Sequence, residues 1–224
     1  MNLSKSLSVF DPETVASYSI LMIGLGATGS QIAFNLAKMG ITNVTFFDYD
    51  IVEEKNVNNQ LYLNSHVGKP KTQALYEILH DINSEFMEHQ FRNEKFDATT
   101  HKKLLSSKTI LYLCVDEGRL NILNGLMPNS NLHYIIETRI GVDVFHVYKV
   151  DRRPKLRELY LNTVPTLERE TSPTEISACG EVMSIIPAIS MCAAVAAQYI
   201  RFLNSSTYMV YMETDNIGLL KEDF

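Results

Sequence analysis

The sequence predicts an α/β fold: a Rossmann-like, three-layer domain with a largely parallel, partly mixed central sheet. Two observations carry this prediction. Short apolar runs of strand length alternate with amphipathic helical segments along most of the 224 residues. The first of these runs ends in a glycine-rich loop that passes directly into a helix. A chain of this length can bury one sizeable core, so we expect a single domain spanning residues 1–224.

The first half of the chain has the pattern of a βαβ unit followed by further helices and strands. The first predicted helix places Leu36 and other apolar residues on one face, and the second does so through Leu75, Ile78 and Leu79. Short apolar runs before and after the first helix are typical of buried strands. The expected elements are strand 18–23, helix 28–39, strand 44–47, helix 71–82, strand 86–91 and helix 99–105.

The second half continues the alternation and then changes it. Residues 109–115 are almost entirely apolar, as expected of a parallel strand covered on both faces. Val142, Val144 and His146 alternate with a two-residue period, which favours a mixed sheet. The expected elements are strands 109–115, 134–137 and 142–150, a proline-containing crossover loop at about 151–178, helix 181–203 interrupted by Pro187, and strand 207–213.

Composition excludes several classes of function. A net charge of −6 gives no general attraction to nucleic acid or anionic lipid. Three cysteines without a CxxC pair favour neither a disulfide framework nor structural zinc, so we expect a cytoplasmic protein. No stretch approaches 18 uninterrupted apolar residues and the N-terminus lacks an apolar signal core, so we expect neither secretion nor membrane insertion.

The glycine-rich loop predicts a nucleotide site. Gly24, Gly26 and Gly29 follow a strand and open a helix, where backbone N–H groups and the helix dipole favour phosphate. Asp48 closes the next strand at the distance along the chain expected of a residue that binds a ribose hydroxyl. The alternative is tight strand–helix packing without a ligand.

Two charged residues extend this site. Lys71 begins a predicted helix, where a cation is unfavourable unless an anion lies nearby; the alternative is a solvated surface lysine. Asp116 follows the strand at 109–115, and open α/β sheets bind ligands at such strand ends. The alternative for Asp116 is that it caps the following helix.

Together these residues resemble the ThiF/MoeB family, whose nucleotide-binding fold is shared with ubiquitin-activating enzymes. The resemblance runs from about residue 18 to residue 203 and depends on the order and spacing of several motifs. In this chain they are Gly24-x-Gly26-x-x-Gly29, Asp48-x-Asp50, the segment Lys55-Asn56-Val57-Asn58-Asn59-Gln60, Lys71 in Gly68-Lys69-Pro70-Lys71, and Asp116.

The resemblance implies an ATP-dependent adenylyltransferase that activates the C-terminal carboxylate of a ubiquitin-like or sulfur-carrier protein. It implies ATP and Mg²⁺ as cofactors, a small β-grasp carrier with a Gly-Gly C-terminus as partner, and a homodimer. By the same resemblance, Asp48 holds the ribose, Asn56 and Lys71 contact the phosphates, and Asp116 supports Mg²⁺ and the chemistry. Lys71 is also the expected catalytic residue that stabilises the charge of the departing pyrophosphate. The full set implied to bind the cofactor is Gly24, Gly26, Gly29, Asp48, Asp50, Asn56, Asn59, Gln60 and Lys71.

The chain departs from the family at its arginines. Asn59 stands where the family has an arginine, and the first arginine of the chain is Arg92, so the N-terminal arginine often lent across the dimer is missing too. Lys55 and Lys69 are candidate replacements, although neither has the two-pronged guanidinium. The alternative is therefore a catalytically inactive binding module or one half of a heterodimer. An NAD-dependent oxidoreductase, which the glycine loop and Asp48 alone would allow, is a third possibility.

The second half of the chain is similar to stand-alone ThiF-like proteins of phages and plasmids. These have a D-G-R-M-G-like segment where this chain has Glu137-Thr138-Arg139, and a single cysteine where it has Cys179. The resemblance makes Cys179 the candidate for a covalent thiol step; the alternative is a packing residue, which is also our prediction for the other two cysteines. Arg139 is either a structural ion-pair residue or a site cation.

Overall fold

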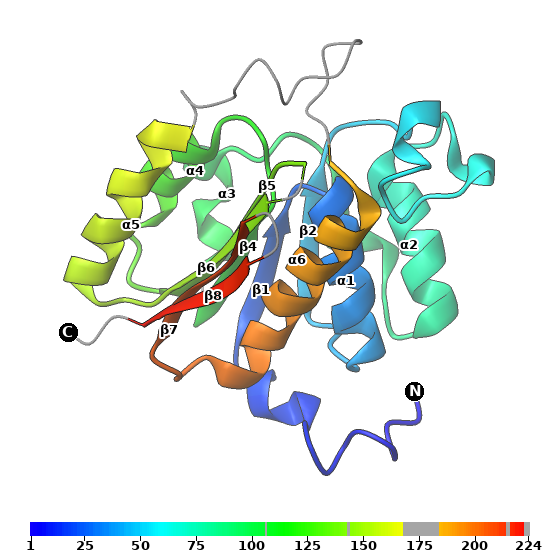
Figure 1. Cartoon of the computed structure of the whole chain (residues 1–224). Helices are drawn as coiled ribbons and strands as arrows, with labels where there is room; N and C mark the ends of the chain where they lie inside the picture. The colour runs from blue at the N-terminus through cyan, green and yellow to red at the C-terminus, as the bar shows by residue number, and fades with distance from the viewer. Residues whose placement is uncertain (106, 143, 168–183, 214–215, 222–224) are drawn as a thin grey trace.

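One eight-stranded sheet forms the centre of the computed structural model, which describes residues 1–105, 107–142, 144–167, 184–213 and 216–221 (Figure 1). The strand order is β3-β2-β1-β4-β5-β6-β7-β8. The first five strands in this order run parallel, and the last three continue the sheet antiparallel. The strands are β1 (Ser19–Ile23), β2 (Val44–Asp48), β3 (Phe91–Asn93), β4 (Thr109–Leu113), β5 (Leu132–Ile140), β6 (Val144–Val150), β7 (Thr207–Glu213) and β8 (Asn216–Lys221). The predicted fold class, largely parallel but mixed, is confirmed.

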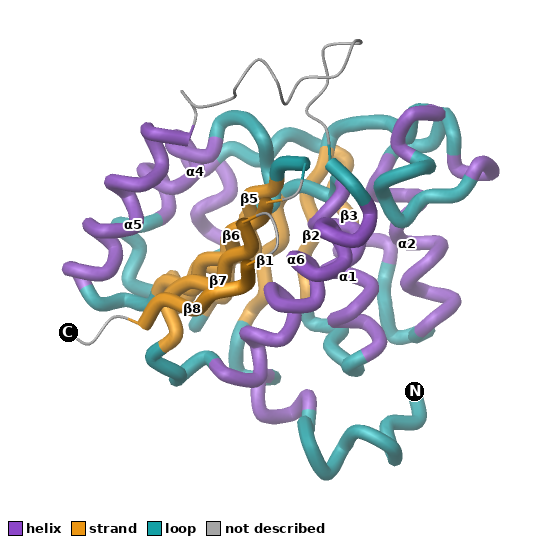
Figure 2. The backbone as a smooth tube through the Cα atoms, viewed as in Figure 1, coloured by secondary structure: helices purple, strands orange, loops and turns teal. Residues whose placement is uncertain are grey.

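Helices cover both faces of this sheet and complete three layers (Figures 1 and 2). Helices α1, α2 and α6 contribute to one hydrophobic core, and α3, α4 and α5 contribute to the other. Residues 20–23 of strand β1 are all apolar because both faces of the strand are buried: Ile20 and Met22 pack into the first core, whereas Leu21 packs into the second. The helices are α1 (Ala27–Lys38), α2 (Lys71–Ile82), α3 (Ala98–His101), α4 (Arg119–Leu126), α5 (Pro154–Leu167) and α6 (Ile186–Gln198).

The segment after α2 differs from the prediction. Residues 86–91 were expected to form a strand, but a short 3-10 helix, Glu88–Gln90, occupies half of this segment, and β3 begins only at Phe91. Phe86 is apolar because its side chain is fully buried among core aromatics, including Phe46, and not because it belongs to a strand. Burial of a loop residue therefore produced the strand-like pattern.

The crossover loop predicted at about 151–178 is wrong for its first half. Helix α5 begins at Pro154, a position where proline fits because first-turn N–H groups lack helical partners. Leu156, Tyr160 and Val164 recur every four residues and are buried in the second core. The prolines and basic residues hid this helical stripe. Residues 168–178 lie outside the described residues.

The C-terminal part also differs in detail. The helix predicted over 181–203 starts at Ile186, with Pro187 in its first turn instead of interrupting it, and ends in the 3-10 helix Tyr199–Phe202. Strand β5 is longer than the predicted 134–137 because Thr138 and Arg139 continue its pairing with β6. Strand β8, which was not predicted, adds an antiparallel edge beside β7.

Candidate nucleotide-binding site

The predicted site residues lie where the chain reverses its direction of travel across the sheet. From β1 the chain moves outward through β2 to β3, then returns to place β4 on the other side of β1. The carboxyl ends of β1 and β4 therefore adjoin at a switch point, the usual place for a ligand in an open α/β sheet. The glycine loop follows β1, Asp48 ends β2, and Asp116 follows β4.

Two of the three loop glycines are required by the protein itself. Gly24 has a positive φ of 91°, and a Cβ there would overlap the carbonyl of Cys114 at the end of β4. A Cβ on Gly29 would overlap the carbonyl of Gly24, so the helix can approach the strand only without a side chain. Tight strand–helix packing therefore explains the glycines at positions 24 and 29.

Gly26 is different, because no atom of the residues that the structure describes lies within 4 Å of a Cβ built on it. It is the residue preceding α1, and no side chain caps that helix N-terminus. Space and backbone N–H groups are thus available together at one point, which suits an anionic group such as phosphate.

Asp48 anchors this loop. Its Oδ2 accepts a hydrogen bond from the Leu25 N–H at 2.7 Å and its Oδ1 accepts one from the Asp50 N–H at 2.8 Å. Burial raises the pKa of Asp48, and the nearby Lys71 charge opposes the rise. Each carboxylate oxygen has a further lone pair, so the predicted ribose contact stays a prediction beside this structural role.

Tyr62 holds the same loop from the other side and was missed by the sequence analysis. Its hydroxyl donates to the Leu25 carbonyl at 2.8 Å, and both residues are almost completely buried. Leu25 is thus fixed at its N–H by Asp48 and at its carbonyl by Tyr62. A tyrosine beyond the Asn-rich segment gave no local signal for this long-range contact.

The Asn-rich segment contributes polar atoms of two kinds. Asn56 is buried, and its Oδ1 accepts a hydrogen bond from the Glu53 N–H at 2.8 Å. This bond caps the start of a short 3-10 helix, Glu54–Asn56. By contrast, Asn59 Oδ1 and Gln60 Oε1 are buried and have no hydrogen-bond partner among the described residues. Orphaned buried polar atoms are uncommon in folded proteins, so these two are consistent with a polar ligand. Phosphate binding by Asn56, Asn59 and Gln60 stays a prediction.

Lys71 is a buried cation and not a solvated surface lysine. An antiparallel bridge between Ile51 and Pro70 brings the start of α2 beside Asp50. There Lys71 Nζ contacts Asp50 Oδ2 at 2.9 Å, with the lysine side chain 9% exposed and the aspartate 49% exposed. The pair joins two residues of the predicted binding set.

The two lysines considered as substitutes for the missing arginine are both engaged elsewhere. Lys69 Nζ lies 2.7 Å from Glu77 Oε2, and Lys55 Nζ lies 3.3 Å from Glu53 Oε2. Neither contact involves a residue of the predicted binding set, so the structure does not support either lysine as a replacement.

Asp116 lies on the loop after β4 and does not cap the next helix. Gly118 holds the position before α4, with φ of 73°, and provides no side-chain cap. The Asp116 side chain is open to solvent, yet the protein around it partly desolvates the carboxylate and raises its pKa, while Arg119 and Lys71 oppose the rise. Asp116 therefore lies within electrostatic reach of Lys71, from the opposite side of the switch point.

The donor set fits a metal ion that is shared with a ligand. No cluster of three or more His, Cys, Asp or Glu side chains suited to a metal occurs among the described residues. Mg²⁺ commonly takes one or two carboxylates and completes its shell with water and substrate phosphates. Asp116 with a triphosphate matches that pattern, and its role as a metal ligand stays a prediction.

Arg139 is an ion-pair residue in this structure. Its Nε and Nη2 donate to the two carboxylate oxygens of Glu137, each at 2.8 Å, and its guanidinium lies 4.3 Å from the centre of the Tyr148 ring. Glu137, fully buried, also contacts Arg119. A glutamate within an apolar strand was the sequence signal for such a network, because a buried carboxylate needs partners.

Neither of the two cysteines that the structure describes is suited to act as a nucleophile. Cys179 lies outside the described residues, so its covalent role stays a prediction. Burial raises the pKa of Cys114 to about 12 and that of Cys192 well above its usual value. Both thiols are therefore protonated at neutral pH, in agreement with the packing role predicted for them.

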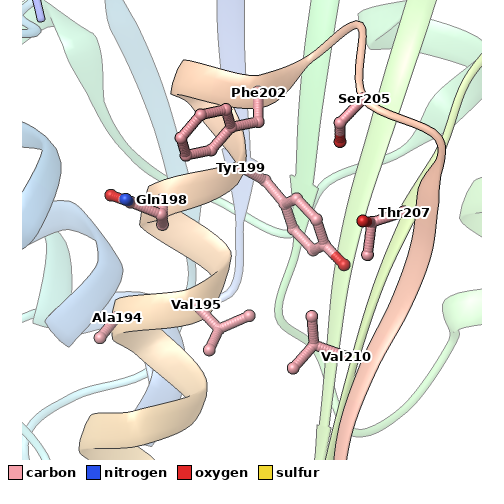
Figure 3. Close-up of a pocket in the computed structure, with 8 residues that line it drawn as sticks. All are labelled: Ala194, Val195, Gln198, Tyr199, Phe202, Ser205, Thr207 and Val210. Atoms are coloured by element: carbon pink, nitrogen blue, oxygen red, sulfur yellow. The ribbon is translucent and has the colours of Figure 1, made fainter. Parts of the chain in front are cut away.

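A separate groove of about 620 Å³ lies between the end of α6 and the start of β7 (Figure 3). The Tyr199 ring points from the helix toward Thr207 and Val210 on the strand. Because β7 runs parallel to β1, the start of β7 is at the sheet edge opposite the glycine loop. The groove is not part of the nucleotide site.

In the part of the chain that the structure describes, no helix is both long and apolar enough to cross a bilayer.

Sequence comparison links the chain to known proteins. The family model described as "ThiF family" matches residues 5–213. Ubiquitin-like modifier-activating enzyme 5 of Dictyostelium discoideum is 36% identical over 100 residues, which is 45% of this chain and 26% of that protein. Ubiquitin-like modifier-activating enzyme ATG7 of Sordaria macrospora is 26% identical over 162 residues, covering 64% of this chain and 23% of that protein. The chain thus spans about a quarter of the length of these relatives.

Solved structures share the fold. E. coli MccB, solved with ATP, aligns with a TM-score of 0.69 at 17% identity over 95% of this chain and 65% of that one. E. coli tRNA N6-threonylcarbamoyladenosine dehydratase, TcdA, solved with AMP, aligns with a TM-score of 0.65 at 16% identity over 89% of this chain and 92% of that one. At these identities the likeness establishes the architecture.

Proposed function

This chain belongs to the ThiF family, and from that membership we propose that it is an adenylyltransferase that uses ATP to activate a carboxylate. One observation supports this most strongly. Three groups suited to a nucleotide gather at one switch point of the sheet: the uncapped helix N-terminus at Gly26, the buried cation Lys71, and Asp116. Solved structures of the same fold contain ATP or AMP, which agrees with a nucleotide ligand.

In the proposed reaction, a carboxylate oxygen of the substrate attacks the α-phosphorus of ATP. A bond forms from that oxygen to phosphorus, the bond to the bridging oxygen of pyrophosphate breaks, and an acyl adenylate and pyrophosphate result. The attacking group is already an anion, so the chain needs no general base. It must instead position two anions and offset their repulsion.

The residues divide this work. The backbone N–H groups around Gly26 bind phosphate oxygens, and Lys71 stabilises the negative charge that accumulates on pyrophosphate. Asp116 would hold Mg²⁺, which supplies further charge neutralisation at the phosphates. Asp50 keeps Lys71 paired and correctly placed until phosphate arrives.

We propose a small carrier protein with a Gly-Gly C-terminus as the substrate class and a homodimer as the assembly. The first part is supported by the relatives named as ubiquitin-like modifier-activating enzymes. A carboxylate of another kind of molecule, such as a peptide, is the other candidate substrate, because the solved structures of the same fold include E. coli MccB with MccA. Cys179 remains the proposed thiol for any covalent step that follows adenylation.

A binding module without turnover is the second candidate function. It is favoured by Asn59 in the family's arginine position together with the engagement of Lys55 and Lys69 by other carboxylates. Loss of a guanidinium that stabilises phosphoryl-transfer charge can lower a rate by orders of magnitude. An NAD-dependent oxidoreductase has less support, since it gives Lys71 and Asp116 no role.

ATP–pyrophosphate exchange tests the proposal. We expect wild-type protein with Mg²⁺ and a candidate Gly-Gly-ended carrier to catalyse exchange, and Asp116→Ala to abolish it. Asn59→Arg should increase the rate of a weakened enzyme and leave a non-catalytic protein at zero. ATP binding without exchange by either protein, across a panel of carriers and peptides, would favour the binding module. Absence of ATP binding would reject both.

A further inference from the structure

A buried group of three charges lies beside the proposed site and is not used by the function described so far. The Glu137 carboxylate, with none of its side chain exposed, accepts two hydrogen bonds from Arg139. It also lies 2.5 Å from Arg119 Nε in an ion contact that lacks hydrogen-bond geometry. Both arginine side chains are less than a tenth exposed. Buried ion pairs seldom stabilise a fold more than apolar residues of similar size would, so stability alone does not explain this group.

Arg119 makes a second contact that Arg139 does not. Its Nη2 donates to the carbonyl of Val115 at 2.7 Å, and Val115 is the residue directly before Asp116. One guanidinium thus joins the loop at 114–118 to the Glu137 carboxylate on β5. The planar guanidinium of arginine can donate a hydrogen bond in one direction and make an ion contact in another.

Glu137 lies beside the point where the 114–118 loop leaves the sheet. In the β4–β5 pairing, Glu137 lies opposite Leu113, the last residue of β4. The loop that carries Asp116 begins immediately after that residue. Glu137 is therefore a fixed point beside the base of the loop.

The same sheet provides an internal control. Arg139 lies two residues further along β5 and shares Glu137, but its other contacts are the rings of Tyr148 and Tyr160. Thr138, between these two charged residues, points to the other face of the sheet and contacts Thr28 of α1. Arg139 thus has the same carboxylate and comparable burial, with no bond to the loop.

Backbone hydrogen bonds hold the loop at its two ends, from the Cys114 N–H to the Ile23 carbonyl and from the Ile122 N–H to the Gly118 carbonyl, and they leave residues 115–117 between them. The loop is exposed from Asp116 to Gly118, and Gly118 has a positive φ with open space around its Cα. A loop of this kind is free to move unless a side chain holds it. The Arg119 bond to the Val115 carbonyl supplies that restraint directly before Asp116.

We propose that Arg119 is a positioning residue that clamps the 114–118 loop so that Asp116 is held near Lys71, and that Glu137 orients the Arg119 guanidinium. The ligand part of this proposal rests on the proposed function, since Asp116 is there the Mg²⁺ residue. The clamp on the loop does not depend on it.

The test compares Arg119→Lys with Arg139→Lys in the full chain. Each variant keeps the positive charge and loses the fork. Amide hydrogen exchange over 114–118 reports the loop, and calorimetric ATP binding is measured with Mg²⁺ and in EDTA. We expect Arg119→Lys to raise exchange of the loop amides and to reduce the Mg²⁺-dependent gain in ATP affinity about tenfold, with affinity in EDTA unchanged. Arg139→Lys should alter neither.

Several outcomes would overturn the proposal. Equal effects of the two variants would reduce Arg119 to a structural ion pair, and unchanged loop exchange in a folded Arg119→Lys protein would remove the clamp. Arg119→Gln, which keeps an N–H donor and removes the buried charge, replaces Arg119→Lys if that variant does not fold. Failure of wild-type protein to bind ATP would reject the proposed function and the Mg²⁺ part of this inference, while loop exchange would still decide the clamp.

Discussion

The hydroxyl of Tyr62 offers a direct test of how the glycine loop is held. Tyr62→Phe removes only the bond to the Leu25 carbonyl, and that carbonyl belongs to a residue with no exposed surface. Burial, with the charges of Asp48 and Asp50, raises the pKa of Tyr62 well above its usual value, so the hydroxyl remains a donor at every ordinary pH.

The size of the effect follows from what is left behind. A typical intramolecular hydrogen bond contributes about 1 kcal/mol, and a buried carbonyl without a donor costs about 1–3 kcal/mol. We therefore expect Tyr62→Phe to lower the free energy of unfolding by about 1–3 kcal/mol, which is roughly 2–4 °C of melting temperature per kcal/mol in a chain of this size. ATP affinity should fall with it, since Leu25 lies within the glycine loop.

Tyr199→Phe is the matched control. Tyr199 is also buried, but in the described part of the chain its hydroxyl has no hydrogen-bond partner, so its removal should leave stability unchanged or slightly increased. Urea unfolding of both variants and wild type measures the difference. Equal changes in the two variants would refute the reasoning that the Leu25 bond, and not the loss of a hydroxyl, determines the result.

Three further predictions concern the site and one buried lysine. Gly26→Ala should fold with nearly wild-type stability but bind ATP at least about tenfold more weakly, whereas Gly29→Ala should lose about 1–3 kcal/mol of stability because its Cβ meets the Gly24 carbonyl. Urea unfolding measures the stability and calorimetry the ATP affinity, and the reverse pattern would contradict our assignment. Lys71→Met should weaken ATP binding by about 10–100-fold through loss of a charge-assisted hydrogen bond, with Lys69→Met, whose partner is Glu77, as a control that should bind normally. Burial lowers the pKa of Lys149 from 10.5 to about 8, so the unfolded chain binds more protons than the folded chain between these pH values, and wild-type stability should rise with pH there. Urea unfolding across pH 7–11 should show a rise of at most about 3 kcal/mol relative to Lys149→Met. A difference independent of pH would show that the carbonyls of Phe202, Leu203 and Ser205 keep the ammonium charged.

The parts of the fold that could be predicted have local signals. Helix α2 was predicted at its observed bounds because Leu75, Ile78 and Leu79 recur on one face. The β1–α1–β2 unit and β4 were predicted within two residues at either end, since buried parallel strands are apolar throughout. The glycine motif and the strand-end Asp116 could be located from the same boundaries.

The parts that could not be predicted depend on contacts between distant residues. Nothing near Tyr62 indicates that its hydroxyl reaches Leu25, and nothing near Arg119 indicates that it donates to Val115 and forms an ion contact with Glu137. Helix α5 was missed because its four-residue stripe is surrounded by prolines and charges that are typical of loops. Phe86 was misassigned because burial of a loop side chain mimics a strand.

The contact between Gly24 and the Cys114 carbonyl has a consequence for when the site comes into existence. The glycine loop is complete by residue 29, but the surface against which it packs belongs to β4, about 80 residues later in the chain. Parallel pairing of β1 with β4 closes a long stretch of intervening chain and is slow for that reason. A nascent chain that has emerged only as far as α3 already contains Lys71 and Asp48, yet its glycine loop has no backing. The pocket is therefore assembled late, as one step with the central strand pair, and a partly synthesised chain cannot trap nucleotide before the sheet has joined.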